Sequence, residues 1–543
     1  MSISEEFYSR VEEFLHEYLR INPLVATYLG IHEYDHLLPK GGWEGFREEE
    51  EFTKRFKEWI NDFSESHDLS QAPIDVRIDV ALLKRTVKLW EFYMYKWKSW
   101  AKYPSAPDTI SSSVFILFGR EFAPYEVRLE SMIGRLERAP DFLERSKEIL
   151  IEPVKRYVDI GIEIASQMGP SLDFLIYISE SRVGGDERVE KLKNVSEKVK
   201  ERVSDYIDWL NDVKRDASEE YRIGGDLFEE LLRLRGLGMD SDSILKLGEY
   251  YLEKFKSEAR KLAREIVGED DVDRAREAVE SEYPKDFDEI LKLYKDSIKR
   301  ARRFVIEKGI APIPEGEVIK VLETPPFMAP VIPFAAYMGP APYEDRKEGI
   351  YLVTRPSKEE DYRRHNVYSI SNTTVHEAYP GHHLQMTWAA VKRNLPRLIS
   401  MDTAFVEGWA HYCEDLMKEY GYDDTPKHRF VQVIDSIWRA VRIIVDVKLS
   451  RREMTFEEAV EMLIRETGMD RRAAEAEVKR YILSPGYQLS YLLGRHLFNE
   501  MRREIREKLG DKYSDYEFHK IVLESCGLPF NYLKELVLHK ISK

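Results

Sequence analysis

Cysteine is almost absent from this sequence, since only Cys413 and Cys526 occur among 543 residues. Two thiols are too few for the disulfide framework of many secreted domains, and the high content of charged residues suits a reducing cytosol. The N-terminus carries acidic residues where a signal peptide needs basic ones, and no run of about 18 apolar residues offers a membrane span. We therefore expect a soluble, cytoplasmic protein.

A net positive charge is also missing. The 83 basic residues face 99 acidic residues, which gives a formal charge of −16. Such a charge repels phosphate backbones and anionic lipid surfaces, so nucleic acid and membranes are disfavoured as partners. The apolar fraction of 43% and the aromatic fraction of 12% indicate a folded globular protein, without indicating an oligomeric state.

Amphipathic helices dominate the first 310 residues. Residues 3–21 place one apolar stripe at helical spacing, made of Phe7, Val11, Phe14, Leu15 and Leu19. Most of the following 280 or so residues repeat this kind of pattern. Residues 1–310 are therefore predicted to be a helical region that forms part of a cleft.

Proline marks a change of architecture near residue 311. Nine of the 24 prolines lie between Pro312 and Pro356, where long helices cannot continue. Within this segment Gly349 to Thr354 is rich in β-branched and aromatic residues, which predicts a strand. We expect a predominantly α protein with a small β-sheet, and a second region, 311–543, of short strands and helices.

Aromatic residues are concentrated between Trp90 and Trp100. Such a cluster can stack nucleic-acid bases, but that use requires a basic surface that this chain lacks. A place in the core or in the wall of a cleft is the favoured interpretation.

Histidine is sparse except in one stretch. Three of the 13 histidines lie within His376-Glu377-Ala378-Tyr379-Pro380-Gly381-His382-His383, which Leu384 and Gln385 follow. Zinc hydrolases commonly present two histidines four residues apart on a helix, with a glutamate after the first. Here that fourth position is Pro380, and a straight helix would place His382 about 9 Å along the axis from His376. Zn–N bonds of about 2.0–2.1 Å cannot span that distance.

Proline and glycine together can break a helix, so a metal site here requires a distortion at Pro380-Gly381. With that distortion, His376 and His382 are the predicted ligands, and His383 is the alternative to His382. If His383 does not bind metal, it and Gln385 are candidates for hydrogen bonds to substrate or to the ligands. The competing interpretation is a polar helix end that binds no metal.

A third ligand is expected from the segment Phe405 to Glu414. Glu407, His411 and Glu414 share one helical face, because they are spaced at i, i+4 and i+7. Glu407 is the predicted ligand, His411 its rival, and Glu414 a partner of a ligand. Glu377 would then accept a proton from water activated by the metal. We expect one Zn²⁺ ion, although cobalt and manganese can use the same ligands.

The stretch from His376 to Gln385, together with Glu407-Gly408-Trp409-Ala410, resembles the DUF885 family, whose members are large helical proteins similar to gluzincin-type zinc metallopeptidases. The resemblance covers nearly the whole chain, from Asn22-Pro23 to Ser484-Pro485-Gly486-Tyr487-Gln488. It implies a gluzincin-like hydrolase core with His-His-Glu ligation. One departure is that the Arg-rich helix of such proteins often continues into Asp-x-Gly-x-His, whereas Asp446 is followed here by Val-Lys-Leu-Ser.

Four further residues are candidates for the site. Tyr487 and Tyr491 are placed to stabilise the negative oxygen that develops during hydrolysis, although two tyrosines four apart are more often core residues. Arg439 and Arg442 lie on an otherwise apolar helix, where they would either bind a substrate carboxylate or pair with nearby aspartates.

These observations predict a zinc-dependent metallopeptidase that cleaves short peptides with Glu377 as general base. The strand from Gly349 to Thr354 suggests a docking edge, since several such enzymes bind an extended peptide along a sheet. A metal-dependent hydrolase of a non-peptide amide or ester is the first alternative. A binding protein with a vestigial metal site is the second, and the presence of Glu377 argues against it because a structural site needs no base.

Overall fold

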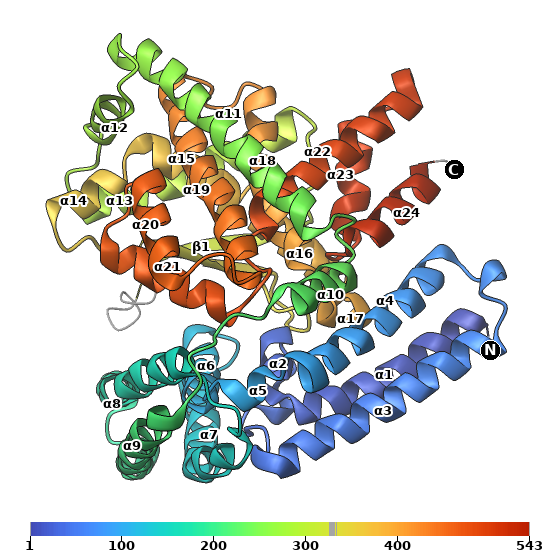
Figure 1. The fold of residues 1–543 in the computed structure, drawn as a ribbon, viewed down its shortest axis with the longest axis vertical. Coiled ribbons are helices and arrows are strands. Elements are labelled where there is room, and N and C mark those ends of the chain that lie inside the picture. The colour runs from blue at the N-terminus through green and yellow to red at the C-terminus, as the bar shows by residue number, and fades with distance from the viewer. Residues whose placement is uncertain (1, 325–331, 333, 542–543) are drawn as a thin grey trace. The chain divides into compact units, whose positions relative to one another are not determined.

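The computed structural model describes residues 2–324, 332 and 334–541 (Figure 1). The chain forms two compact units, residues 1–221 and 222–543. Both are built mainly of helices, as the periodicity of the sequence predicts. The change in composition near residue 311 lies inside the second unit, so the expected helical region 1–310 spans the first unit and the first helices of the second.

The first unit contains nine α-helices and five short helical turns among its described residues. The α-helices are α1 (Ile3–Ile21), α2 (Pro23–Leu29), α3 (Gly42–Ser66), α4 (Ile74–Glu91), α5 (Ser99–Lys102), α6 (Ala106–Gly119), α7 (Tyr125–Ser146), α8 (Lys155–Val183) and α9 (Glu187–Val213). The short turns are η1 (His32–Tyr34), η2 (Leu69–Gln71), η3 (Phe92–Trp97), η4 (Lys147–Ile149) and η5 (Lys214–Asp216), of which η3 is a π-helix.

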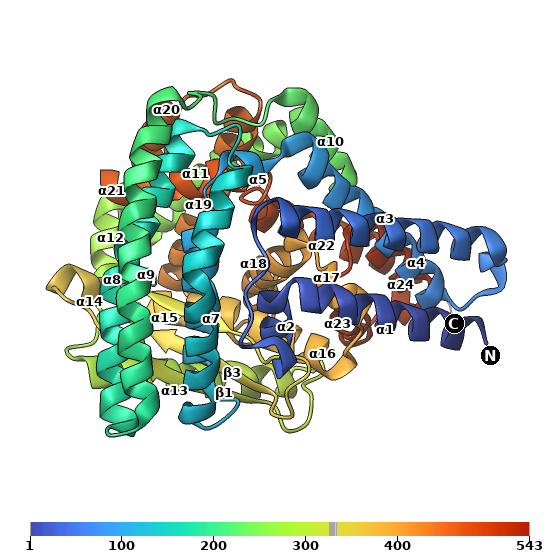
Figure 2. The same ribbon diagram turned by 90° about the horizontal axis from the view of Figure 1, so that it is seen from below.

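Two groups of helices make the core of the first unit. Helix α1 begins with a capping box between Ser2 and Glu5, and its predicted apolar stripe is buried. It packs with α3 and α4, the blue helices in Figures 1 and 2. Helices α7, α8 and α9 run side by side and share a second apolar core with α6 (Figure 2). Burial of these stripes is the main source of stability, since the hydrophobic effect grows with buried apolar area.

The second unit starts with α10 (Gly225–Arg235), α11 (Ser241–Val267), α12 (Val272–Glu280) and α13 (Phe287–Glu307). Three strands follow, β1 (Val318–Glu323), β2 (Ala335–Met338) and β3 (Glu348–Val353). The remaining elements are α14 (Glu359–Arg364), α15 (Val367–Glu377), α16 (His382–Lys392), α17 (Leu395–Ile399), α18 (Thr403–Glu419), α19 (Pro426–Ser450), α20 (Phe456–Thr467), α21 (Arg471–Leu483), α22 (Ser490–Leu509), η7 (Gly510–Lys512), α23 (Asp515–Glu524) and α24 (Phe530–Ile541).

The sheet has the order β1-β3-β2, with β3 parallel to β1 and antiparallel to β2. Strand β3 confirms the strand predicted between Gly349 and Thr354. It is the central strand and is almost entirely buried, which its continuous apolar sequence allows. The predicted docking edge is therefore placed wrongly on β3, because β1 and β2 are the strands at the two edges.

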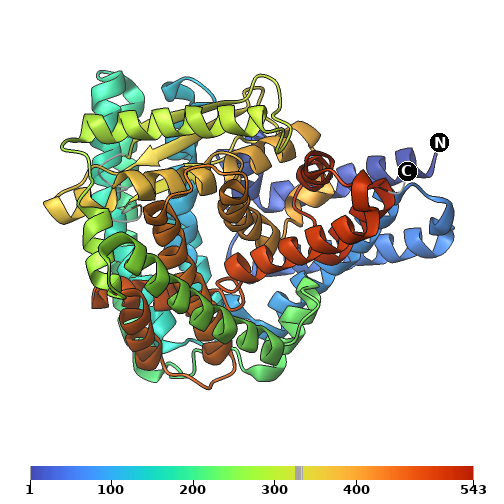
Figure 3. The same ribbon diagram turned by 90° about the horizontal axis from the view of Figure 1, so that it is seen from above.

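Two closely packed helix pairs form part of the second unit. Helix α11, the long green helix in Figure 3, packs against α19, and α18 packs against α22. Cys413 and Cys526 are both buried and are not joined in a disulfide, as expected. In the described parts of the chain, no helix combines the length and apolarity needed to cross a membrane.

Candidate metal centre

The helix carrying the histidine motif breaks where the sequence predicts. Helix α15 ends at Glu377 and α16 begins at His382. The N–H of Gly381 donates to the carbonyl of Val375 at 3.1 Å, and a Cβ at position 381 would overlap the carbonyl oxygens of Val375 and His376. Only glycine fits this close backbone approach. The break brings the rings of His376 and His382 to 4.9 Å between centroids, with their planes at 87°.

Glu407 reaches both of these histidines from α18. Its Oε2 lies 3.4 Å from His382 Nε2 and 4.0 Å from His376 Nε2. Two ligand atoms bound tetrahedrally at about 2.0–2.2 Å from zinc lie roughly 3.3–3.6 Å apart. The pair of His382 and Glu407 already has this separation, and His376 is within a few tenths of an ångström of it. The three predicted ligands are thus brought together.

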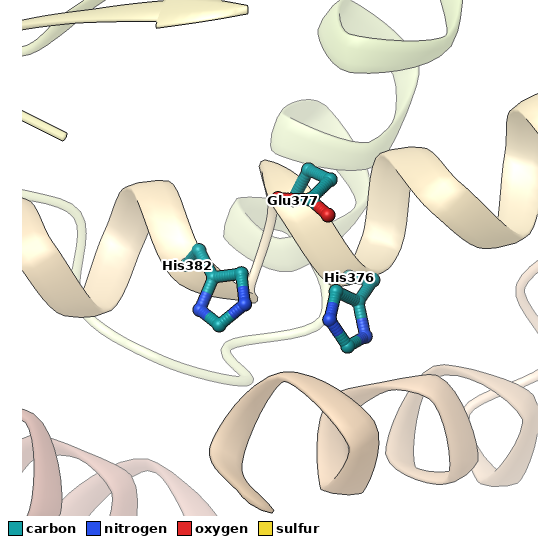
Figure 4. Close-up of side chains that lie close together, drawn as sticks. All are labelled: His376, Glu377 and His382. Atoms are coloured by element: carbon teal, nitrogen blue, oxygen red, sulfur yellow. The ribbon is translucent and has the colours of Figure 1, made fainter. Parts of the chain in front are cut away.

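Glu377 is close to the same centre but on another side of it. One potential ligand atom from each of His376, Glu377 and His382 lies within 4.8 Å of the others. In Figure 4 both imidazole rings lie below the helix break, and Glu377 lies above them and between them. Glu377 and Glu407 therefore compete for the third ligand position. The distances from Glu407 Oε2 to the two histidine nitrogens are those of metal ligands, which favours Glu407 as the third ligand. Glu377 is then available to accept and donate protons.

Buried hydrogen bonds orient His376. Its Nδ1 lies 2.8 Å from Glu414 Oε1, and Asn372 donates to the other oxygen of Glu414 at 3.1 Å. Burial alone would raise the pKa of Glu414, but the charge of Arg439 and the hydrogen bond with His376 outweigh it and hold this pKa well below its usual range. A carboxylate that accepts from Nδ1 leaves Nε2 directed at the centre. Asn372 lies four residues before His376, so helical spacing was the signal that could have identified it.

His383, the alternative ligand, is held in a different network. Its Nδ1 lies 2.8 Å from the hydroxyl of Tyr337 on β2, and its Nε2 lies 2.8 Å from Glu317. Tyr379 and Arg302 also donate to Glu317. Both ring nitrogens are therefore engaged away from Glu407, and His383 joins the metal-bearing segment to the edge strand. No motif in the sequence around Glu317 marks it for this role.

The other alternative ligand, His411, also faces away from the centre. Its Nε2 accepts a hydrogen bond from Arg495 at 3.0 Å, which requires an unprotonated nitrogen there. Burial and then the charge of Arg495 lower the pKa of His411 well below its usual range. Gln385 is fully buried and is not among the described residues that line the cavity at the centre. Its expected part in substrate binding has no support from this position.

Tyr487 and Tyr491 reach the centre because α22 packs closely on α18. A Cβ at Gly408 would overlap the backbone of Gly494, so glycines permit this approach. The hydroxyl of Tyr487 donates to Glu407 Oε1 at 3.0 Å and so orients the carboxylate. Tyr491 lines the cavity, and burial followed by the charge of Glu407 raises its pKa. Of the two tyrosines, Tyr491 is the one placed to meet a substrate.

The two predicted arginines differ in their surroundings. Arg439 lines the cavity, 3.6 Å from Glu414 and 3.8 Å from Asp435. The guanidinium of Arg442 lies over the rings of Trp438 and Tyr491, at 3.9 and 4.5 Å from their centres. Arg442 is thus occupied by protein contacts and is not among the described residues of the cavity wall. Only Arg439 has access to a bound molecule.

The cavity has a volume of about 370 Å³ and carries an excess of negative charge. Four carboxylates line it, namely Glu377, Glu407, Glu414 and Asp435. Among its described lining residues, Arg439 is the only lysine or arginine. Burial would raise the pKa of Glu407, but His382, His376 and Tyr487 together lower it to about 2. Two imidazoles and an ionised carboxylate are suitable zinc ligands, and a divalent cation would offset the surplus charge. The residues present therefore fit the expected metal.

Comparison with known proteins identifies relatives of this chain. The sequence model of a family described as "bacterial protein of unknown function (DUF885)" matches residues 23–537. Comparison with curated protein sequences gave no significant match.

Two solved structures share the fold. A protein from Shewanella oneidensis, 21% identical, has a TM-score of 0.80 over 97% of this chain and 98% of its own. A protein from Colwellia psychrerythraea, 19% identical, has a TM-score of 0.85 over 100% and 99%. Both are described as a "putative lipoprotein", the first one of unknown function. At these identities the similarity shows the fold alone, and the expected cytoplasmic location stays a prediction.

Proposed function

The chain belongs to the DUF885 family, and from the geometry of its candidate metal centre we propose that it is a zincin-like, zinc-dependent hydrolase that cleaves short peptides. The observation that carries this proposal is the position of one Glu407 oxygen, 3.4 Å and 4.0 Å from the Nε2 atoms of His382 and His376. Glu377 lines the same cavity at the helix break. This combination of two imidazoles, a carboxylate and a neighbouring base is what metal-assisted hydrolysis requires.

His376, His382 and Glu407 would hold the ion. Bound there, a divalent ion supplies Lewis acidity, which polarises a carbonyl group and lowers the pKa of a water molecule. Glu377 accepts a proton from the attacking water and transfers it to the leaving amine. Glu414 fixes the ring of His376, and Tyr487 fixes the carboxylate of Glu407.

Tyr491 would stabilise the negative oxygen that forms on the substrate carbonyl. A tyrosine hydroxyl is protonated at neutral pH and can donate a hydrogen bond, and burial followed by the charge of Glu407 raises the pKa of Tyr491 further. One donor of this kind is worth roughly 2.7–4 kcal/mol in the transition state. Tyr487, which already donates to Glu407, has a positioning role instead.

The edge strand β2 supports a peptide rather than an isolated ester as substrate. Ala335, Ala336 and Tyr337 of β2 line the cavity next to the metal centre. An extended peptide can pair with such an edge through main-chain hydrogen bonds, which do not depend on its side chains. A cavity of about 370 Å³ is at the small end of ligand sites, and this favours short substrates.

The proposal is tested with purified full-length protein loaded with Zn²⁺. Metal content is measured by mass spectrometry, and a library of short peptides is then incubated with the protein. We expect about one zinc per chain and cleavage of a subset of peptides, abolished by chelation and restored by zinc. Stoichiometric zinc without cleavage of any peptide would contradict peptidase activity. Products formed from cell extract under the same conditions would then identify a non-peptide amide or ester.

A further inference from the structure

A second pocket lies within the first unit, among α1, α3, η3 and the chain that follows them. Its volume is about 380 Å³. Seven of its described lining residues are aromatic, namely Tyr18, Phe46, Phe52, Trp90, Tyr93, Trp100 and Phe142. Part of the aromatic run between Trp90 and Trp100 therefore forms the wall of a pocket, one of the two places expected for it. The π-helix η3 supplies Tyr93, and π-helices occur frequently at functional sites.

The rings form two groups. Trp90 stacks on Tyr18 at 5.2 Å between centroids with a 13° angle between planes, and Phe52 lies 6.0 Å from Trp90. On the other side Phe46 lies 4.7 Å from Trp100. The faces of aromatic rings carry negative electrostatic potential and attract cations. A pocket bounded by several such rings is suited to a cation that is poorly hydrated.

Glu49 is the only charged residue among the described residues that line this pocket. No lysine, arginine or histidine in the described chain forms an ion pair with it, whereas its neighbour Glu48 pairs with Arg20 and Lys40. Its side chain is exposed to solvent, but the surrounding protein atoms reduce its solvation, and this desolvation followed by the charge of Glu48 raises its pKa to about 7. Burial and the charge of Glu49 raise the pKa of Tyr18 to about 12. The negative charge of Glu49 is therefore felt at Tyr18, one of the rings grouped around Trp90.

The kind of cation that suits the pocket depends on how many N–H donors the cation has, because each donor needs an acceptor among the polar groups of the pocket. Besides Glu49 they include Asn22, Thr53, Ser99 and Thr109. A primary ammonium has three N–H donors and a guanidinium has five, and each donor needs an acceptor when it leaves water. A quaternary ammonium has no N–H donor, so a single carboxylate and neighbouring aromatic rings are enough to hold it.

We propose that this pocket binds a small quaternary ammonium compound, held by the aromatic rings and by the carboxylate of Glu49. The volume is that of a site for a small molecule. The pocket lies entirely within the first unit, so this binding does not depend on the proposed hydrolase activity.

Calorimetric titration of the full-length protein with three probes tests the proposal. Choline carries a quaternary ammonium, 3,3-dimethylbutan-1-ol is its neutral isostere, and ethanolamine has a primary ammonium instead. We expect choline to bind at least tenfold more tightly than either of the others. Equal binding of choline and the neutral isostere, or tighter binding of ethanolamine, would overturn the proposal.

Two variants identify the groups responsible. Glu49→Gln should weaken choline binding at least fivefold, while Glu51→Gln, on the same helix but not among the described residues that line the pocket, should leave it unchanged. Tyr93→Leu keeps an apolar side chain but removes a ring that is 42% exposed, so it should weaken binding of choline and not of the neutral isostere. Circular dichroism confirms that each variant is folded. Wild-type choline affinity in folded Glu49→Gln would refute the role of the carboxylate.

Discussion

The candidate metal centre and the aromatic pocket both contain carboxylates, but they are built in opposite ways. At the metal centre four carboxylates line one cavity, and Glu407 and Glu414 are bonded to histidines, Tyr487 or Asn372. In the aromatic pocket the single carboxylate of Glu49 lies among rings and has no cationic partner in the described chain. The first arrangement suits a small divalent cation with directed ligands. The second suits a large, weakly hydrated cation that needs no directed ligand.

The largest effect is expected from Glu377→Gln. The amide keeps the size of the side chain but cannot accept a proton, so kcat should fall about 10²–10⁴-fold. Zinc stoichiometry and choline binding should not change, because Glu377 is neither the proposed ligand nor part of the pocket in the first unit. Peptide kinetics and metal analysis measure both quantities. Glu307→Gln, at the exposed end of α13, is the control, and full activity of Glu377→Gln would show that Glu377 is not the base.

A smaller effect is expected from Glu414→Gln. Loss of the carboxylate removes the acceptor that orients His376, and changes of this kind lower metal affinity by about 10–100-fold. Competition with a chelator of known zinc affinity measures the change. Glu419→Gln on the same helix is the control, because its side chain is exposed and pairs with Arg502. Unchanged affinity in Glu414→Gln would mean that His376 does not depend on this hydrogen bond.

His365, in the unit that holds the candidate metal centre, should contribute a pH dependence of stability with a definite sign. His365 is buried against the ring of Phe334, and burial lowers its pKa to about 4. The folded state therefore favours the neutral ring, and its stabilising contribution is complete above the unfolded pKa of about 6.5 and is lost as the pH falls towards 4. At pH 5 the expected loss is about 2 kcal/mol.

Urea denaturation at pH 7.5 and pH 5 checks this contribution. His365→Gln should show a smaller loss of unfolding free energy between the two pH values than the wild type. His539→Gln, near the C-terminus, is the control. An unchanged pH dependence in His365→Gln would contradict a neutral, buried His365.

The smallest effect, with the opposite sign, is expected in the unit that holds the aromatic pocket. The folded pKa of Glu49, about 7, lies above its unfolded value, because the surrounding protein reduces the solvation of this exposed side chain and Glu48 adds a like charge. Its contribution to stability is present below about pH 4.5 and is lost as the pH rises through 7. Glu49→Gln should therefore stabilise the protein more at pH 8 than at pH 5, measured by the same denaturation. If Glu49→Gln destabilised the protein more at pH 8 than at pH 5, Glu49 would not be an uncompensated charge. The same would follow if Glu51→Gln changed the stability in the way expected for Glu49→Gln.

Much of the metal centre follows from the sequence because its groups are near one another in the chain. His376, His382 and the break between them lie within one motif, and the missing i+4 histidine required that break. Glu407 and Glu414 share a helical face, so one helix brings both to the centre. Asn372 could have been identified by the same helical spacing, because it lies four residues before His376. The rest required the fold, since Glu317 reaches His383 from a proline-rich segment with no motif of its own.

The aromatic pocket could not be predicted in the same way. Its lining comes from residues 18 to 149, and each aromatic side chain is also consistent with an ordinary core position. The sequence shows Glu49 within a run of glutamates and gives no sign that Glu48 has cationic partners while Glu49 has none among the described residues. The order of the strands could not be predicted from the sequence either. The apolar pattern predicts β3, but it does not show that β2 lies at an edge of the sheet.

Anomalous diffraction at the zinc edge, from crystals of the zinc-loaded protein, tests the central claim most directly. We expect one strong peak, about 2.0–2.2 Å from His376 Nε2, His382 Nε2 and an oxygen of Glu407. Absence of a peak, or a peak bound by His383 or His411 instead, would contradict it.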